Sequence, residues 1–283
     1  MNQYPVFGIY EKALHPDSFE RMMDDAASCG YSSLEFSLDS TNERLSRLNW
    51  SHQQIAALRA ASVNSGVSIL TTCLSGHKRF PLGSSDPAVV KCGMELMQKA
   101  IDFCAEAGIR VIQLSGFDVY DQEPRTDITR ARYEDNLVKC VEMAERACVT
   151  LAIEPVEGNL LCVTDTMEVV RRIDSPFLQV YPDPANICSL GIEPIADLYA
   201  GKGHIAAVHM RESLPNQFDA TVPFGTGNLD FKGVFRALDD IGFHGPLIVE
   251  MWNENRENYL EYITQARVFM QNVLDELRSE KHV

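Results

Sequence analysis

Short apolar runs rich in β-branched residues recur along the chain, separated by longer segments with a different pattern. Most of these runs lack the polar alternation of a strand that has one face in water. A continuous apolar run is typical of a strand covered on both faces. We therefore predict eight buried strands, at residues 6–10, 33–36, 67–74, 111–114, 150–154, 178–181, 205–209 and 247–250.

The segments between these runs carry apolar residues three and four positions apart, the spacing of a helix packed along one side. Ser51, followed three residues later by Gln54, predicts a helix start with a capping box, and Gly66 and Gly108 stand where helices should end. The clearest apolar series are Val90, Met94, Met97, Ile101 and Cys104; Tyr133, Leu137, Val141, Ala144 and Cys148; and Phe231, Val234, Phe235 and Leu238.

Alternating strands and helices indicate parallel strands joined by crossover helices. Eight such units in a chain of 283 residues predict a (β/α)8 TIM barrel, a fold of typically about 250 residues. A doubly wound open sheet is the alternative, but no GxGxxG follows the first strand. No linker rich in Pro, Ser or Gly and no charge run divides the chain. We expect a single α/β domain over residues 1–283, with a polar tail from about Arg278.

The charge balance limits the partners. Twenty-five basic against 40 acidic residues give a net charge of −15, which argues against nucleic acid and against an anionic membrane surface. No apolar run approaches the roughly 18 residues of a membrane span.

The eight cysteines show no paired CxxC spacing, and Met1 to Leu14 has no basic stretch before an apolar core. Reduced thiols and the lack of a signal peptide predict a cytoplasmic protein.

The last four predicted strands end in ligand-type residues, in the sequences TLAIE, LQVYPD, IAAVH and PLIVE. Because strand ends of a barrel share one rim, Glu154, Asp183, His209 and Glu250 should meet there. One polar strand end is ordinary, but three converging carboxylates would repel one another without a cation. The set predicts one divalent metal ion. Mn²⁺, Mg²⁺ and Co²⁺ suit it, as does Zn²⁺ with open positions, and of these we expect Zn²⁺ or Mn²⁺.

Two of these ligands have the chemistry for catalysis. A metal that holds two oxygens of a hydroxy-ketone acidifies the carbon between them, because the cation stabilises the enediolate. Glu154 and Glu250 come from strands five and eight and can face opposite sides of such a substrate. If one carboxylate removes a proton and the other delivers one to the reverse face, a stereocentre is inverted.

An anionic substrate would need local cations in so acidic a protein. The loop after the third strand carries His77, Lys78 and Arg79, then Ser84, and runs into the next helix, whose N-terminus favours phosphate. A solvated basic loop is the alternative interpretation. In the loop after the fourth strand, Tyr120 could add a hydroxyl.

Other polar residues stand at the same rim. Lys12, Asn186 and Arg211 could contact substrate hydroxyls, and Trp252 could form a wall of the pocket. Glu35, at the end of the second strand, could hydrogen-bond another rim group, although we do not place it in the site.

Several long stretches match one known family. They are GIYEKAL (8–14), NERLSRLNWS (42–51), CLSGHKRFPLGS (73–84), IRVIQLSGFDVY (109–120), VPFGTG (222–227) and IVEMW (248–252). The chain resembles the L-ribulose-5-phosphate/L-xylulose-5-phosphate 3-epimerases of the xylose-isomerase-like barrel superfamily. The resemblance implies a (β/α)8 barrel, a divalent metal on Glu154, Asp183, His209 and Glu250, and epimerisation at C3 of a pentulose 5-phosphate with the two glutamates as acid and base. It also allows a homodimer.

The sequence departs from that family pattern at two places. Glu154 is followed by Pro155, and His209 is followed by Met210 and Arg211 where the family has Val and Lys. An Arg fork differs from a Lys point charge, so a changed substrate contact is an open alternative.

Three other functions stay open. An isomerase or epimerase of another ketose or ketose phosphate would share the metal chemistry. A metal hydrolase of the endonuclease type would need several His ligands and a positive face, which fit poorly with seven His and a charge of −15. A sugar-phosphate binding protein without activity would use the same ligands.

Overall fold

Eight parallel strands form one sheet in the order β6-β5-β4-β3-β2-β1-β8-β7 in the computed structural model. An isolated parallel bridge between Val180 and Ile205 joins β6 to the segment before β7 and closes the sheet into a barrel. The prediction of a (β/α)8 barrel is confirmed. The strands are β1 (Phe7–Tyr10), β2 (Ser33–Ser37), β3 (Ser68–Leu74), β4 (Val111–Ser115), β5 (Thr150–Glu154), β6 (Leu178–Val180), β7 (Val208–Met210) and β8 (Leu247–Val249).

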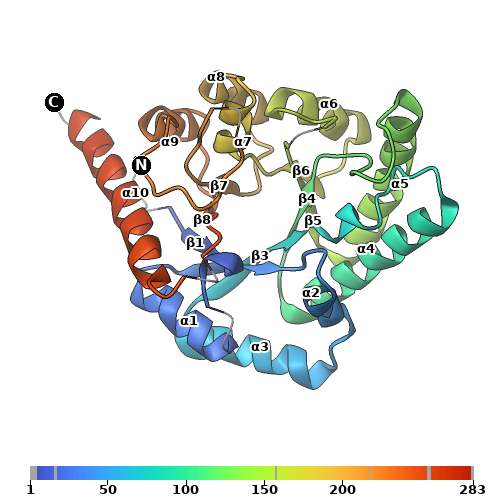
Figure 1. The fold of residues 1–283 in the computed structure, drawn as a ribbon, viewed down its shortest axis with the longest axis horizontal. Helices are drawn as coiled ribbons and strands as arrows, with labels where there is room; N and C mark the ends of the chain where they lie inside the picture. The colour runs from blue at the N-terminus through green and yellow to red at the C-terminus, as the bar shows by residue number, and fades with distance from the viewer. Residues whose placement is uncertain (1–4, 16–17, 157, 216, 254–255, 282–283) are drawn as a thin grey trace.

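Helices surround these strands (Figure 1). The structure describes residues 5–15, 18–156, 158–215, 217–253 and 256–281. The α-helices are α1 (Phe19–Ser28), α2 (Asn42–Ser46), α3 (His52–Ser65), α4 (Pro87–Ala107), α5 (Asp127–Ala147), α6 (Val163–Ile173), α7 (Pro184–Ser189), α8 (Pro194–Leu198), α9 (Phe231–Asp240) and α10 (Tyr259–Lys281). Short 3-10 turns are η1 (Glu11–Ala13), η2 (Arg47–Asn49), η3 (Gly76–Lys78) and η4 (Tyr199–Gly201).

The helix boundaries follow local chemistry. The Ser51 hydroxyl accepts the N–H of Gln54, and the Gln54 side chain accepts the N–H of Ser51, which completes the predicted capping box at the start of α3. Gly66 and Gly108 end α3 and α4 with φ of 73° and 83°, where a residue without a Cβ avoids strain.

Two layers of apolar side chains fill the molecule. The larger lies between the sheet and the helices. The smaller lies inside the barrel and consists of Tyr10, Cys73, Ala152, Tyr181, Ala207 and Ile248. The Tyr181 ring centroid is 4.7 Å from that of His209, so this inner cluster lies directly against the predicted metal ligands. A packed barrel interior gives these ligands a rigid base.

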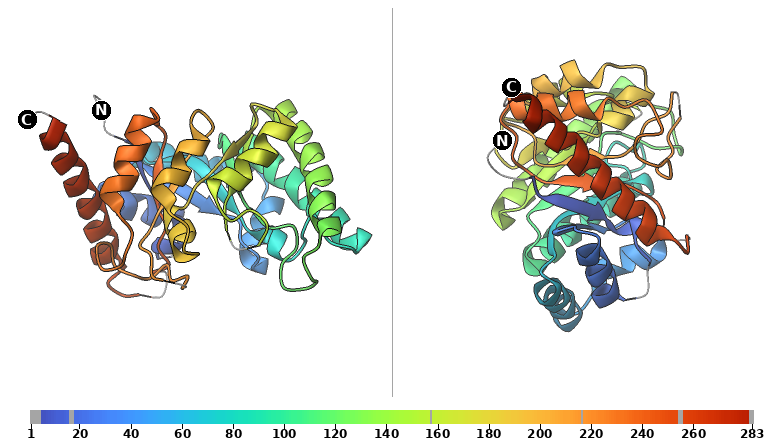
Figure 2. Two further views of the ribbon diagram at one scale, coloured as in Figure 1. Left: turned by 90° about the horizontal axis from the view of Figure 1, so that it is seen from above. Right: turned by 90° about the vertical axis from the view of Figure 1, so that its left-hand side faces the viewer.

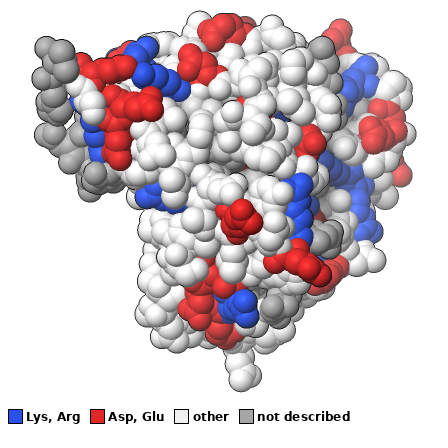
Figure 3. All heavy atoms as spheres, turned by 60° about the vertical axis from the view of Figure 1, so that its left-hand side comes forward, with Lys and Arg blue, Asp and Glu red and all other residues white. Residues whose placement is uncertain are grey.

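The C-terminal helix α10 packs against α9 on the outside of the barrel (Figure 2). It extends to Lys281, so residues 278–281 of the polar tail are helical, and residues 282–283 lie outside the described part. None of the helices in the described part is long and apolar enough to cross a membrane. On the face drawn in Figure 3, acidic and basic side chains are interspersed in small groups.

Candidate active site and metal centre

Four side chains from consecutive strand ends meet at one rim of the barrel. Glu154 ends β5, Asp183 follows β6 as the N-cap of α7, His209 lies within β7 and Glu250 follows β8. All four are buried, and one potential ligand atom of each lies within 4.8 Å of the others. The structure thus brings together the whole ligand set expected from the strand ends.

The His209 ring lies between carboxylates on both sides. Its Nε2 is 2.6 Å from Oε2 of Glu35, and its Nδ1 is 3.0 Å from Oε1 of Glu154 and 3.8 Å from Oε2 of Glu250. Burial lowers the pKa of His209, but the charges of Glu35, Glu154 and Glu250 outweigh it and raise that pKa well above the ordinary value. A positive charge is therefore strongly favoured at this point.

Glu154 is fixed by two amide side chains. Gln113, in β4, donates to Oε2 of Glu154, and Nδ2 of Asn186 donates to Oε1 at 3.1 Å. Burial raises the pKa of Glu154 in spite of the neighbouring His209. The two amides leave little freedom for this carboxylate to turn, so its direction toward the cluster is set.

Asp183 is held from two directions. Its Oδ1 accepts the backbone N–H groups of Ala185 and Asn186 at the start of α7, and its Oδ2 accepts from Nε of Arg211 at 2.8 Å. Arg211 is only 1% exposed and also donates to Oδ1 of Asn186 and to the carbonyl of Glu212. Sequence reasoning gave Arg211 a substrate contact. In the structure its guanidinium instead bonds Asp183, Asn186 and the Glu212 carbonyl, and Arg211 is not among the residues that line the pocket.

Glu250 differs from Glu154 in having an unsatisfied atom. Its buried Oε2 has no hydrogen-bond partner among the described residues, and the nearest cationic nitrogen is Nε of Arg211 at 3.6 Å. Burial raises the pKa of Glu250 to about 7. A buried acceptor without a partner, next to three other ligand-type side chains, has the chemistry of a cation ligand.

The charges of the cluster support the same conclusion. With Glu35 included, four carboxylates lie around His209, and within this group Arg211 is the cation that contacts them. Three oxygen ligands and one imidazole suit a divalent metal such as Zn²⁺, Mn²⁺, Mg²⁺ or Co²⁺. The residues present therefore fit a divalent cation held by Glu154, Asp183, His209 and Glu250.

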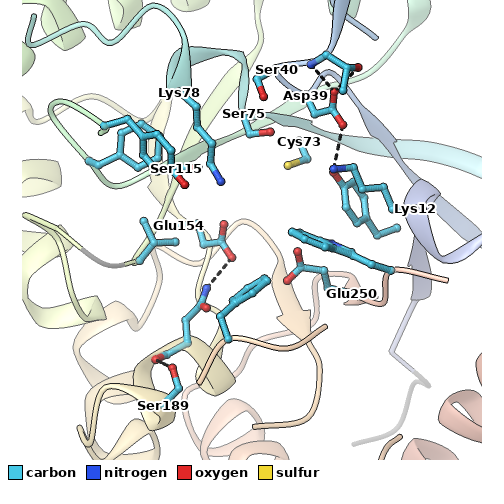
Figure 4. A pocket seen from close by; sticks show the side chains of 18 of the residues that line it. Lys12, Asp39, Ser40, Cys73, Ser75, Lys78, Ser115, Glu154, Ser189 and Glu250 are labelled. Carbon is cyan, nitrogen blue, oxygen red and sulfur yellow. Dashed lines mark hydrogen bonds and ion pairs between the residues drawn. The ribbon is translucent and has the colours of Figure 1, made fainter. Parts of the chain in front are cut away.

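A pocket of about 710 Å³ opens above this cluster. Glu154 and Glu250 lie at its floor and face each other across it, while Lys12 and Lys78 enter from the loops after β1 and β3 (Figure 4). Asn186, Tyr120 and Trp252 also line it. Of the expected substrate contacts, the structure brings together Lys12, Lys78, Tyr120, Asn186 and Trp252 around one space.

The two lysines are held differently. Nζ of Lys12 is 2.9 Å from Oδ2 of Asp39 and 4.8 Å from the Trp252 ring centroid. Nζ of Lys78 is 4.9 Å from the Tyr120 ring centroid, and it forms no ion pair with a carboxylate in the described part of the chain. Lys78 therefore supplies an uncompensated positive charge to the pocket.

Three residues of the predicted basic loop lie outside the pocket. His77 is buried, its Nε2 is 3.2 Å from the carbonyl of Gly93, and burial lowers its pKa to about 4. Arg79 bonds the carbonyl of Ser40 and Oδ1 of Asn42, and Ser84 is buried, where its hydroxyl accepts the N–H of Asp86. For His77 the reason is the 3-10 turn Gly76–Lys78, in which the side chains of His77 and Lys78 point about 120° apart.

Two contacts of the site were not expected from the sequence. For Glu35 the sequence predicts only a hydrogen bond to an unspecified rim group, and it predicts no role for Gln113. Both lie in the middle of buried strands, at 0% exposure. A carboxylate or amide in the middle of a buried strand needs a buried partner. The position of Glu35 and Gln113 within such strands is therefore the sequence feature that could have indicated their contacts.

Known proteins resemble this chain over most of its length. The family model described as xylose isomerase-like TIM barrel matches residues 23–272. L-ribulose-5-phosphate 3-epimerase UlaE of Escherichia coli (strain K12) is 44% identical over 267 residues, which cover 94% of this chain and 93% of that protein. The UlaE protein of Salmonella heidelberg (strain SL476) is 43% identical over the same shares.

Solved structures show the same fold at lower identity. A structure of L-ribulose 3-epimerase has a TM-score of 0.81 at 20% identity and covers 99% of this chain and 97% of that chain. D-psicose 3-epimerase in the presence of D-fructose has a TM-score of 0.79 at 19% identity, over 95% and 99%. The chain therefore belongs to the xylose isomerase-like TIM barrel family and, as a relative of its epimerases, is an enzyme of the isomerase class.

Proposed function

We propose that this enzyme is a metal-dependent 3-epimerase that interconverts L-ribulose 5-phosphate and L-xylulose 5-phosphate. The observation that carries the proposal is the pair of carboxylates, Glu154 and Glu250, at the floor of a pocket that also contains Lys12 and Lys78. The 44% identity to L-ribulose-5-phosphate 3-epimerases supports the same substrates.

The metal centre of the proposal consists of Glu154, Asp183, His209 and Glu250. A divalent cation bound there would supply electrostatic stabilisation to the oxygens that become negative when C3 loses its proton. The side chains around these ligands serve to orient them. Arg211 holds Asp183 and Asn186, and Asn186 in turn holds Glu154.

The two glutamates exchange the proton. In one direction Glu154 takes the C3 proton from one face and Glu250 delivers a proton to the other, and in the reverse direction the roles change. Their positions on β5 and after β8, opposite each other across the pocket, support this division (Figure 4).

The phosphate end of the substrate is assigned to Lys12 and Lys78. Lys12 enters the pocket from the loop after β1 and Lys78 from the loop after β3 (Figure 4), and Lys12 also pairs with Asp39. Phosphate oxygens bound by ammonium groups form charge-assisted hydrogen bonds, which are stronger than neutral ones. In a protein with a net charge of −15, an anionic substrate needs local positive charge, and Lys78, which pairs with no carboxylate in the described part of the chain, supplies it in this pocket.

Three further expectations belong to the proposal. The eight cysteines, all described, form no disulfide, which supports a cytoplasmic location. A homodimer and a single domain over residues 1–283 remain predictions. Size-exclusion chromatography with light scattering measures the oligomeric state directly.

The test is proton NMR in D₂O with L-ribulose 5-phosphate and L-xylulose 5-phosphate, with and without added Mn²⁺ or Zn²⁺. The proposal predicts deuterium at C3 of both pentulose phosphates and interconversion of the two. Label at C1 would indicate aldose–ketose isomerase chemistry instead. If the enzyme converts the unphosphorylated pentuloses as fast as the 5-phosphates, the assignment of Lys12 and Lys78 to the phosphate group is wrong.

A further inference from the structure

A carboxylate outside the ligand set makes the shortest contact to His209. Glu35 lies in β2, which β1 and β8 separate from β7 in the sheet, and its side chain is fully buried. Its Oε2 is 2.6 Å from Nε2 of His209. Its other oxygen, Oε1, accepts the Tyr181 hydroxyl at 2.7 Å and the Thr71 hydroxyl at 2.9 Å. Glu35 therefore links Thr71 of β3 and Tyr181, which directly follows β6, to the ring of His209.

The hydrogen-bond inventory of Glu35 fixes the proton on the imidazole. An ionised carboxylate only accepts, so Nε2 of His209 must carry the hydrogen that Oε2 of Glu35 receives. In the neutral ring, Nδ1 then has the free lone pair. Nδ1 is the nitrogen that faces Glu154 and Glu250, at 3.0 and 3.8 Å. The hydrogen bond between Glu35 and His209 thus leaves Nδ1 as the nitrogen whose lone pair can bind a cation at the cluster.

We propose that Glu35 is a positioning residue that holds His209 in the Nε2–H tautomer and thereby makes Nδ1 the metal-ligating atom. This inference rests on the proposed metal centre. Histidine ligands of metals generally donate their other N–H to a carboxylate, carbonyl or water, which fixes the ring and raises its basicity. Here that partner comes from a strand that contributes no metal ligand.

Packing alone does not explain why a glutamate stands at position 35. Inside the barrel, burial of a carboxylate costs free energy that an apolar side chain of similar volume would avoid. Glu35 also adds a fourth negative group around His209, where three carboxylates already lie. The hydrogen bond to His209 is the feature that an apolar residue could not replace.

The informative substitution is Glu35→Gln, which conserves shape. If the amide oxygen keeps the Tyr181 and Thr71 hydroxyls, the NH₂ group faces Nε2 of His209, which must then accept. The proton moves to Nδ1 and blocks its lone pair. The matched control is Tyr181→Phe, which removes one donor to Glu35 but keeps the ring against His209 and the carboxylate facing Nε2.

The experiment measures Co²⁺ affinity by absorption titration of metal-free wild type, Glu35→Gln and Tyr181→Phe, with thermal unfolding to verify the fold of each. For Glu35→Gln we expect affinity to fall roughly 10- to 100-fold, and for Tyr181→Phe a much smaller change. Equal Co²⁺ affinity in wild type and folded Glu35→Gln would overturn the inference while leaving the metal centre intact. Absence of Co²⁺ binding to wild type would overturn both.

A second measurement does not depend on any variant. Long-range ¹H–¹⁵N NMR of the Zn²⁺-loaded wild-type protein, with ¹⁵N-labelled histidine, identifies which His209 nitrogen carries hydrogen. Hydrogen on Nε2 with Nδ1 coordinated supports the inference. Hydrogen on Nδ1 with Nε2 coordinated contradicts it, even if Glu35→Gln fails to fold.

Discussion

The two ends of the pocket are built in opposite ways. At the carboxylate end, Glu154, Asp183 and His209 are buried and fixed by hydrogen bonds from other buried side chains or backbone groups. At the cationic end, Lys12 and Lys78 enter from the 3-10 turns after β1 and β3, where Lys12 pairs with Asp39 and Lys78 pairs with no carboxylate in the described part of the chain. The contrast separates two tasks: the reacting carbon needs fixed groups around it, whereas a phosphate needs charge within reach.

The largest expected effect comes from the carboxylate end. Glu250→Gln keeps the shape of the side chain but removes the proton carrier, so we expect kcat to fall about 10³-fold or more. Sugar-phosphate binding should persist, because the two lysines are unchanged. Calorimetric titration gives the dissociation constant and the NMR assay gives kcat. A variant with kcat within tenfold of wild type would show that Glu250 is not an acid or base.

Removal of the metal tests the four proposed ligands at the carboxylate end together. Without a cation the clustered carboxylates repel each other, so a chelator should abolish activity and lower the melting temperature. Adding back metal at 100 times its dissociation constant should restore about 2.7 kcal/mol of stability. Differential scanning fluorimetry with EDTA, then with Mn²⁺ or Zn²⁺, measures this. Identical melting curves and activity in EDTA would contradict the metal centre.

His77 belongs to the basic loop by sequence but is buried outside the pocket, and the pH dependence of stability tests that burial. Burial lowers the pKa of His77 to about 4 from 6.5, so the unfolded chain binds the proton first as pH falls. Stability is therefore full above about pH 6.5 and declines toward pH 4. By pH 5 the His77 contribution should have lost about 2 kcal/mol.

The variant His77→Gln isolates that contribution, because Gln can still donate to the Gly93 carbonyl but does not titrate in this range. Urea unfolding at pH 7 and pH 5 should show a smaller loss of stability in the variant than in wild type. Parallel losses in the two proteins would mean that His77 is not the residue responsible.

The smallest expected effect concerns the substrate anchor. Lys78→Met should raise KM for the pentulose phosphate about tenfold, the loss of one hydrogen bond to a charged group, with little change in kcat. The control is Arg79→Met, one residue along, because Arg79 bonds Ser40 and Asn42 and does not line the pocket. If both variants raise KM equally, the pocket charge does not come from Lys78 alone.

The same contrast explains what the sequence could predict. The ligand set follows from the strand ends, because a barrel places all carboxyl ends at one rim, so Glu154 and Asp183 are found without knowledge of side-chain packing. The direction of a loop side chain depends on turn geometry. In the basic loop the 3-10 turn sends Lys78 into the pocket and buries His77, which residue order does not reveal.

Contacts between side chains of different strands inside the barrel could not be predicted from the sequence either. Glu35 and His209 are 174 residues apart, and their contact depends on which strand faces which across the interior. The same holds for Arg211, whose guanidinium bonds Asp183, 28 residues earlier in the chain, and which does not line the pocket. A polar residue inside a buried strand signals that a partner exists but does not identify the partner.

The central claim is that Glu154 and Glu250 act on opposite faces of the same carbon, and deuterium exchange in the two glutamine variants tests it most directly. In D₂O with metal, Glu154→Gln and Glu250→Gln should each exchange the C3 hydrogen of one pentulose 5-phosphate only. The two variants should select opposite epimers, and neither should convert one epimer into the other. Exchange of both epimers by either variant would contradict the two-carboxylate account.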